Sequence, residues 1–154
     1  MSSIKTSQIV LTPEGKKFAE QIKRLAKTSV AVGFSDSSIV YDNGSSLVEV
    51  ATENELGSST RPARPFMKQS WKNGNTKLAN ASATVCESIA DGGNAATALD
   101  QLGRFGKEVV QNEISTGHFA ANSEATIKRK GSNRPLIDTG LMLNSVNYKV
   151  REGN

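Results

Sequence analysis

Apolar side chains recur at helical spacing in three stretches of the chain. The first follows Thr12 and Pro13, a capping residue and a proline in the first helical position, and predicts a helix over residues 13–27. The second covers residues 66–90 and the third covers residues 95–116. Glycines near residues 92 and 117 end these two stretches, and the run Asn73-Gly74-Asn75 could kink the first of them. We expect the two long helices to form a hairpin.

Two other stretches alternate between apolar and small or polar side chains, as half-buried strands do. They are residues 29–34, with Val30, Val32 and Phe34 on one side, and residues 146–150 near the end of the chain. Residues 39–41 could add a short further strand. Because the two main stretches are far apart in the chain, they predict a sheet that pairs distant segments.

Capping signals predict shorter helices between these elements. Ser46 and Glu49 have the spacing of a capping box, and Gly57 is placed to end the helix that they begin. Near the end of the chain, the run Asp138-Thr139-Gly140 opens a further turn of helix. Together these elements predict an α+β fold, with a small antiparallel sheet packed against two long helices and one or two shorter ones.

The length of 154 residues suits one domain with one modest core, and no stretch of the chain reads as a linker between domains. We therefore expect a single domain over residues 1–154. Within it, residues 1–11 are predicted to form a flexible N-terminal arm and residues 128–135 a flexible basic loop. Hydrophobic residues make up only 36% of the chain, a lean composition in which neighbouring subunits would order the softer loops.

The charges are clustered, although the net charge is only +4. Basic residues gather in two places: Arg61, Arg64, Lys68, Lys72 and Lys77, and then Lys128, Arg129, Lys130 and Arg134. Acidic residues gather between residues 35 and 57: Asp36, Asp42, Glu49, Glu53 and Glu55. Patches of opposite sign on one subunit suit head-to-tail contacts between copies, and equally they could be solvated faces.

Cys86 is the one cysteine, which excludes an intramolecular disulfide and any site with several cysteine ligands. A reducing cytosol is therefore the expected place of synthesis. The first residues lack the apolar run of a signal peptide, and no stretch reaches the ~18 apolar residues that a membrane span requires. We expect no membrane partner.

The most tempting catalytic motif is Leu136-Ile137-Asp138-Thr139-Gly140, which resembles the Asp-Thr-Gly signature of retroviral-type aspartic proteases. That mechanism needs a flap and the rest of a barrel after the motif, yet only residues 141–154 follow. Asp138 or Thr139 as a cap of the next helix is the simpler interpretation.

Other candidate motifs also have plainer structural explanations. The run Gly103-Arg104-Phe105-Gly106 matches a basic nucleic-acid-binding loop, but its helical surroundings favour close packing with Phe105 in the core. His118 is the one histidine and falls in a predicted loop. We therefore expect no enzymatic activity, no cofactor and no metal site.

Six segments together resemble the tail-completion and head-tail joining proteins of tailed bacteriophages, the lambdoid minor tail-component family. The segments span residues 29–150, and their order and spacing carry the resemblance. They read VAVGF at residues 30–34, VATENELG at 50–57, RPARPFM at 61–67, ATIKRKG at 125–131, PLIDTG at 135–140 and SVNYKV at 145–150. Where the family often has His-Glu-aromatic-Gly, this chain has Asn54-Glu55-Leu56-Gly57, which speaks against metal chemistry at that position.

The resemblance implies a structural virion protein, a ring-forming subunit in the neck or tail. Its partners would be further copies of itself, a connector or stopper protein, and tail tube or tail terminator proteins, with DNA passing through the channel. Candidate interface residues are Arg61, Arg64, Lys68, Lys128, Arg129, Lys130, Arg134, Glu53 and Glu55. Gly57, Pro62, Pro65, Phe66, Asp138, Thr139 and Gly140 are expected to be structural.

Residue chemistry adds detail to this expectation. Pro62 and Pro65 stiffen the loop that presents the arginines, and Arg64 is expected to pair with a carboxylate, inside the subunit or across a ring interface. Phe66 and Trp71 are expected in the core. The alternative is a small nucleic-acid-binding protein without catalysis, using the basic clusters with Trp71 or Tyr148 as stacking groups.

Overall fold

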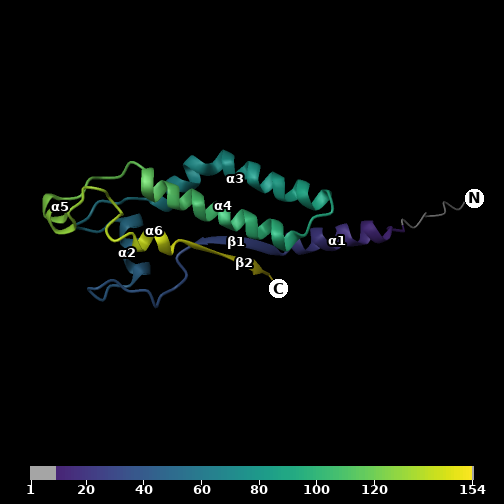
Figure 1. The fold of residues 1–154 in the computed structure, drawn as a ribbon, viewed down its shortest axis with the longest axis horizontal. Coiled ribbons are helices and arrows are strands. Elements are labelled where there is room, and N and C mark those ends of the chain that lie inside the picture. Colours follow the sequence, from purple (N-terminus) through teal and green to yellow (C-terminus); the bar gives the residue numbers. More distant parts are fainter. Residues whose placement is uncertain (1–9, 154) are drawn as a thin grey trace, which may run out of the picture.

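A computed structural model of the chain describes residues 10–153, so most of the expected N-terminal arm lies outside the described residues. The described chain is elongated, with helices α1 (Pro13–Ala26), α2 (Leu47–Leu56), α3 (Phe66–Ala90), α4 (Ala95–Thr116), α5 (Glu124–Lys130) and α6 (Leu141–Ser145), and strands β1 (Thr28–Gly33) and β2 (Asn147–Glu152). The α+β prediction is confirmed. Figure 1 shows α1 at one end of the molecule and α2, α5 and α6 at the other.

The two long helices form the predicted hairpin, and α3 continues without interruption through the expected kink at Gly74. Gly74 is buried, and a Cβ atom there would approach Cγ1 of Val109 to 2.6 Å. A larger side chain would therefore push the helices apart, and the glycine that suggested a kink allows close packing instead.

The sheet consists of β1 and β2, paired antiparallel with Val30 opposite Val150 and Val32 opposite Tyr148. Helix α4 packs against both strands, while α3 covers the other side of α4. Two glycines of α4 allow this contact: Gly103 lies against the ring of Tyr148, and Gly106 lies against Val32. The glycines at residues 103 and 106 thus allow close packing, as expected. The packing is of α4 against the two strands.

Buried side chains form two clusters along the hairpin. The larger one joins α2 and α6 to α3 and α4. It includes Leu47, Phe66, Val110 and Val146, each at most 1% exposed. The smaller one lies at the turn between α3 and α4, where Ile89 and Ala95 are buried. Phe66 is a core residue as predicted, because it begins α3 directly beneath α2.

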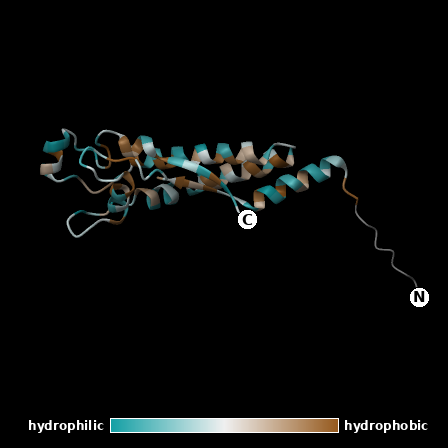
Figure 2. Cartoon of the chain, turned by 90° about the horizontal axis from the view of Figure 1, so that it is seen from below, coloured by the Kyte–Doolittle hydropathy of each residue, from teal (hydrophilic) through white to brown (hydrophobic). Residues whose placement is uncertain are grey.

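Helix α1 is attached to the body mainly by polar contacts. None of its residues is buried. The Gln21 side chain accepts a hydrogen bond of 2.8 Å from the Ala95 backbone N–H, and Arg24 forms an ion pair of 2.7 Å with Glu152. Leu25 reaches the edge of the smaller core cluster. Figure 2 shows α1 projecting from the body, with apolar and polar residues on its surface.

Four detailed predictions were wrong. Trp71 is 41% exposed because it lies on the outer side of α3, and Phe105 is half-buried because Gly103 and Gly106 occupy the inner face of α4. Residues 39–41 form only an isolated bridge between Val40 and Ser46. Finally, residues 128–130 of the expected flexible loop form the last turn of α5, since Ser123 caps this helix and Gly131 ends it in a left-handed conformation.

Candidate functional site

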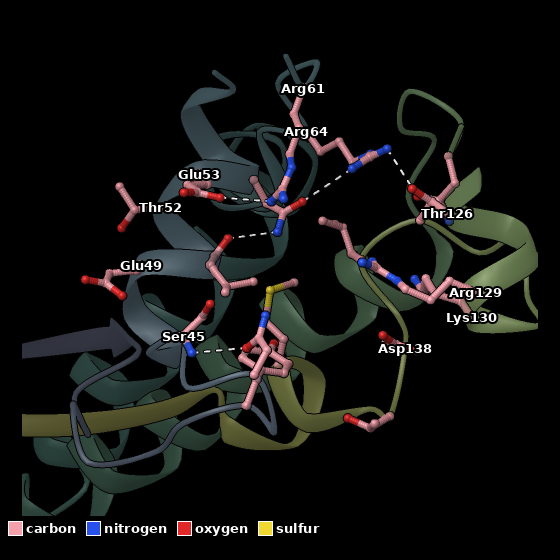
Figure 3. Close-up of a pocket in the computed structure, with 18 of the residues that line it drawn as sticks. Ser45, Glu49, Thr52, Glu53, Arg61, Arg64, Thr126, Arg129, Lys130 and Asp138 are labelled. Atoms are coloured by element: carbon pink, nitrogen blue, oxygen red, sulfur yellow. Dashed lines mark hydrogen bonds and ion pairs between the residues drawn. The ribbon is translucent and has the colours of Figure 1, made fainter. Parts of the chain in front are cut away.

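An open cleft of about 1270 Å³ lies at the end of the molecule opposite α1. Its walls come from α2, from the loop after α2, from α5 and from the segment before α6. Figure 3 shows charged side chains of both signs around it, with Glu49 and Glu53 on the α2 side and Arg129 and Lys130 on the α5 side. Segments that are distant in the chain therefore build one surface.

The α2 wall is positioned by capping interactions at both ends. Ser46 accepts a hydrogen bond of 3.1 Å from the Glu49 backbone, and Glu49 accepts one of 3.2 Å from the Ser46 backbone, which completes the predicted capping box. At the other end, Gly57 has a φ of 75°, and a Cβ atom there would lie 2.8 Å from the Ala63 nitrogen. Only glycine fits this position without strain.

Glu55 connects α2 to the start of α3. Its two carboxylate oxygens accept hydrogen bonds of 2.8 Å from the Met67 N–H and 3.1 Å from the Lys68 N–H. The N-cap residue of α3 is Pro65, which offers no side-chain hydrogen bond, so the carboxylate supplies the missing cap from another helix. Glu55 therefore has a structural role within the chain, and its expected place in an interface stays a prediction.

Arg64 fastens the loop after α2 to the segment before α5. Its guanidinium donates hydrogen bonds of 2.8 Å to the Ala120 carbonyl and 3.0 Å to the Ala121 carbonyl. It also reaches the amide oxygens of Asn54 and Asn122. The expected pairing with a carboxylate inside the subunit is wrong, because the partners within the chain are backbone and amide oxygens, and a pairing across a ring interface stays a prediction. Burial lowers the pKa of the Arg64 guanidinium, and the positive charge of Arg61 lowers it further.

Arg61 points to the rim of the cleft instead. It forms an ion pair of 2.9 Å with Glu53, and both side chains are more than half exposed, at 62% and 52%. An exposed pair of this kind contributes roughly 0–1 kcal/mol to stability. Both groups therefore remain able to exchange this contact for a charged neighbour at little cost.

The opposite wall carries Arg129, Lys130 and Asp138. The Lys130 ammonium donates a hydrogen bond of 3.2 Å to the Arg134 carbonyl, and burial lowers the pKa of this ammonium while the carboxylate of Asp138 opposes that shift. Asn122 also donates to the Arg134 carbonyl. Residues 131–135 are thus held against the body at Arg134, by contacts that the charge pattern did not predict.

The segment before α6 is strained at one residue. Leu136 has a φ of 61°, a left-handed conformation that costs a branched residue about 1 kcal/mol or more. Its side chain packs against the larger core cluster, and this apolar contact offsets the strain. The Thr139 hydroxyl accepts a hydrogen bond of 3.3 Å from the Leu141 N–H, so Thr139 supplies the cap. Gly140, the residue just before the helix, has a left-handed conformation.

Some of the sequence-predicted residues line the cleft, while the others lie elsewhere, with Glu55, Gly57, Pro65, Phe66 and Gly140 at the helix ends described above. Arg61, Arg64, Glu53, Arg129, Lys130, Asp138, Thr139 and Pro62 line the cleft. Lys68, Lys128 and Arg134 are exposed elsewhere, at the start of α3 and around α5. Asn54 and Asn122 were not anticipated as cleft residues, since single asparagines in loops and helices carry no distinctive spacing.

The arrangement offers hydrogen-bonding groups and charges of both signs. No group of His, Cys, Asp or Glu within residues 10–153 is placed to hold a metal ion, and over the same residues no helix has both the length and the apolar character of a membrane span. Comparisons with family models, with curated proteins and with solved structures find no match for this chain. The cleft itself is therefore the basis on which a function can be proposed.

Proposed function

We propose that this chain is a structural, non-enzymatic subunit of a tailed phage particle, a ring-forming neck or tail-completion protein that joins the head connector to the tail. The main support for the proposal is that segments resembling the phage joining proteins come together at one surface. Of the six segments that resemble the joining proteins, those at residues 50–57, 61–67, 125–131 and 135–140 all contribute residues to the cleft.

The chemistry of the cleft supports docking of a protein partner. Its rim carries exposed carboxylates and exposed basic groups, and electrostatic complementarity of this kind mainly selects partner and register. The loop that carries Arg61 is held rigid by Pro62, Pro65 and the hydrogen bonds of Arg64. Rigidity reduces the entropy lost when a partner docks.

Electron microscopy of lysates from a phage with a stop codon early in this gene tests the proposal. We expect filled heads beside unattached or aberrant tails, and restoration of joined particles by the wild-type gene supplied in trans. A matched pair of complementing genes sharpens the test: Arg61→Glu with Arg129→Glu should fail to restore joining, while Lys77→Glu, outside the cleft, should restore it. Normal infectious particles without the gene would refute the proposal.

One observation favours the alternative of a nucleic-acid-binding protein. Trp71 is exposed on α3. The exposed Lys68 lies about one helical turn before it, and the exposed Lys72 is the next residue, so an aromatic ring and positive charges lie on the same part of the helix. Tyr148 does not share this property, since its ring lies against Gly103 and its hydroxyl bonds Asp100. Salt-dependent binding of a short single-stranded DNA that is lost in Trp71→Ala would support this alternative.

A further inference from the structure

We infer that copies of this chain associate head to tail, with the exposed face of α1 from one copy docked against the exposed face of α2 from the next. This inference deepens the proposed function and rests on it for its biological setting, because it names the two surfaces through which the ring would close. Helices α1 and α2 lie toward opposite ends of the molecule (Figure 1), and each carries exposed apolar side chains.

Helix α1 presents the first surface. Phe18 and Ile22 lie one helical turn apart and are 44% and 39% exposed, and Leu11 just before the helix is 47% exposed. Gln21, Arg24 and Leu25 contact the body, and within residues 10–153 no element covers the exposed parts of Phe18 and Ile22. An exposed apolar stripe on an amphipathic helix is a typical site for association with a partner.

Helix α2 presents the second surface. Glu49, Thr52, Glu53 and Leu56 are all exposed. Thr52 and Glu53 lie three and four residues after Glu49, and Leu56 lies three residues after Glu53, so the four share one broad side of the helix. Leu56 is 73% exposed. Figure 3 shows Glu49 and Thr52 pointing away from Arg129 and Lys130, while the Glu53 carboxylate is joined to Arg61.

The two surfaces are complementary in charge. Residues 13–27 contain the basic residues Lys16, Lys17, Lys23, Arg24 and Lys27 against Glu14 and Glu20, whereas α2 contains three glutamates and no basic residue. Glu53 is paired only with the exposed Arg61, and that pair could yield to a lysine of a neighbour. The two helices therefore carry net charges of opposite sign, and each also has exposed apolar side chains.

The placement of the surfaces determines the kind of assembly. Because different surfaces at opposite ends meet, the contact is heterologous, and repeated copies form a closed ring or an open chain. A contact of two short helices is smaller than the ~1,200 Å² that a stable interface normally buries, so each contact is weak alone and gains strength when the ring closes. Association is best detected by trapping the contact covalently.

Disulfide trapping tests the inference. In a Cys86→Ser background, Ile22→Cys and Leu56→Cys are made as separate single-cysteine proteins, and circular dichroism checks that each is folded. After mixing and oxidation we expect a cross-linked heterodimer of the two variants, and little homodimer from either alone. A Leu56→Cys protein mixed with Thr97→Cys, an exposed position on α4, serves as the matched control. Cross-links between two copies of Ile22→Cys, or no heterodimer above the control, would overturn the inference.

A charge exchange separates this inference from the proposed function. Glu49→Lys with Glu53→Lys should abolish the cross-link, and Lys16→Glu with Lys23→Glu in the opposite partner should restore it. If the cross-link forms but phage lacking the gene assemble normally, the association stands and the virion role fails. If joining requires the gene but the cross-link never forms, the virion role stands and this contact is wrong.

Discussion

At the scale of single residues, the absence of a side chain is as important here as its presence. Gly103 and Gly106 let α4 approach the sheet, and Gly74 lets α3 approach α4. Tyr148 fills the space beside Gly103, and its hydroxyl donates a hydrogen bond of 2.7 Å to Asp100. Three layers of the fold thus depend on glycines whose neighbours lie far away in the chain.

Two helical glycines should respond oppositely to alanine. The methyl group of Gly103→Ala would overlap the Cδ2 edge of the Tyr148 ring. Overpacking of this kind should lower the free energy of unfolding by roughly 1–3 kcal/mol. Gly15→Ala meets only ordinary contacts at 3.5 Å in α1 and should be neutral or raise stability by up to about 1 kcal/mol. Urea denaturation measures both, and equal effects of the two substitutions would contradict the packing at Gly103.

The Asp100 carboxylate should report the Tyr148 hydrogen bond. The hydrogen bond from the Tyr148 hydroxyl lowers the pKa of Asp100 most, and Arg104 lowers it further. The ionised Asp100 therefore stabilises the fold when the pH is above the ordinary aspartate pKa. This stabilisation is lost as the pH falls through the pKa of Asp100 in the folded state. Tyr148→Phe keeps the ring and removes the hydroxyl. A carbon-detected NMR titration should then show the Asp100 midpoint move upward, while that of Asp36, bonded to Ser38, stays in place.

The same hydrogen bond also affects stability at basic pH, through the ionisation of Tyr148. Asp100 raises the pKa of the Tyr148 hydroxyl, so its contribution to stability is present below the ordinary tyrosine pKa of 10.0 and is lost as the pH rises through the folded-state value. The spectrophotometric titration of the two tyrosines should therefore shift downward for Tyr148 in the Asp100→Asn variant. An unchanged titration would mean that the hydroxyl does not bond the carboxylate in solution.

At the scale of elements, α2 and α3 are joined by a cap that crosses between helices. Glu55 satisfies two backbone N–H groups at the start of α3, where Pro65 provides none. The same junction places Phe66 in the core and Arg61 at the rim of the cleft. Stability of the long helix and geometry of the cleft therefore depend on one carboxylate.

Replacing Glu55 should destabilise the protein more than replacing its neighbour Glu53. Glu55→Ala leaves the part-buried Met67 N–H and the exposed Lys68 N–H without this acceptor and should cost about 1–2 kcal/mol of unfolding free energy. Glu53→Ala removes only an exposed ion pair and should cost less than about 1 kcal/mol. Thermal denaturation of both variants checks this order, and a larger effect at Glu53 would show that the cap is not formed.

At the scale of the whole molecule, stability is distributed unevenly. The hairpin of α3 and α4 contains both core clusters, whereas α1 has no buried residue and is held by a few polar contacts at the far end. Segments with few buried apolar contacts open at lower free energy than the core. The end that carries the inferred docking helix is therefore the end that a neighbour would stabilise most.

Hydrogen exchange measured by mass spectrometry should show this difference. Amides of α1 should exchange well before those of α4 in the isolated chain, because opening α1 exposes little apolar surface. Gln21→Ala should accelerate exchange in α1 further and leave α4 unchanged, since it removes only the hydrogen bond to Ala95. Equal protection of α1 and α4 would contradict the weak attachment seen here.

Most of the helices and strands can be predicted from the sequence, because helix periodicity, strand alternation and caps are local signals. Residues 13–27, the capping box at Ser46 and the two long helices follow from such signals, and the pairing of residues 29–34 with the final strand followed from their shared alternation. Phe66 was recognisable as core for the same reason. The short α5 was missed because its basic last turn resembled a solvated loop.

Only the tertiary structure decided which partners the polar groups have. Arg64 bonds the carbonyls of residues 120 and 121, Glu55 caps α3, and Trp71 lies on an outer face, and none of these outcomes has a signal at short range in the chain. The physical reason is that a helix face or a charged side chain can be satisfied by water, backbone or another charge at similar free energy. Packing of distant segments selects among these, and it brought four of them together to form the cleft.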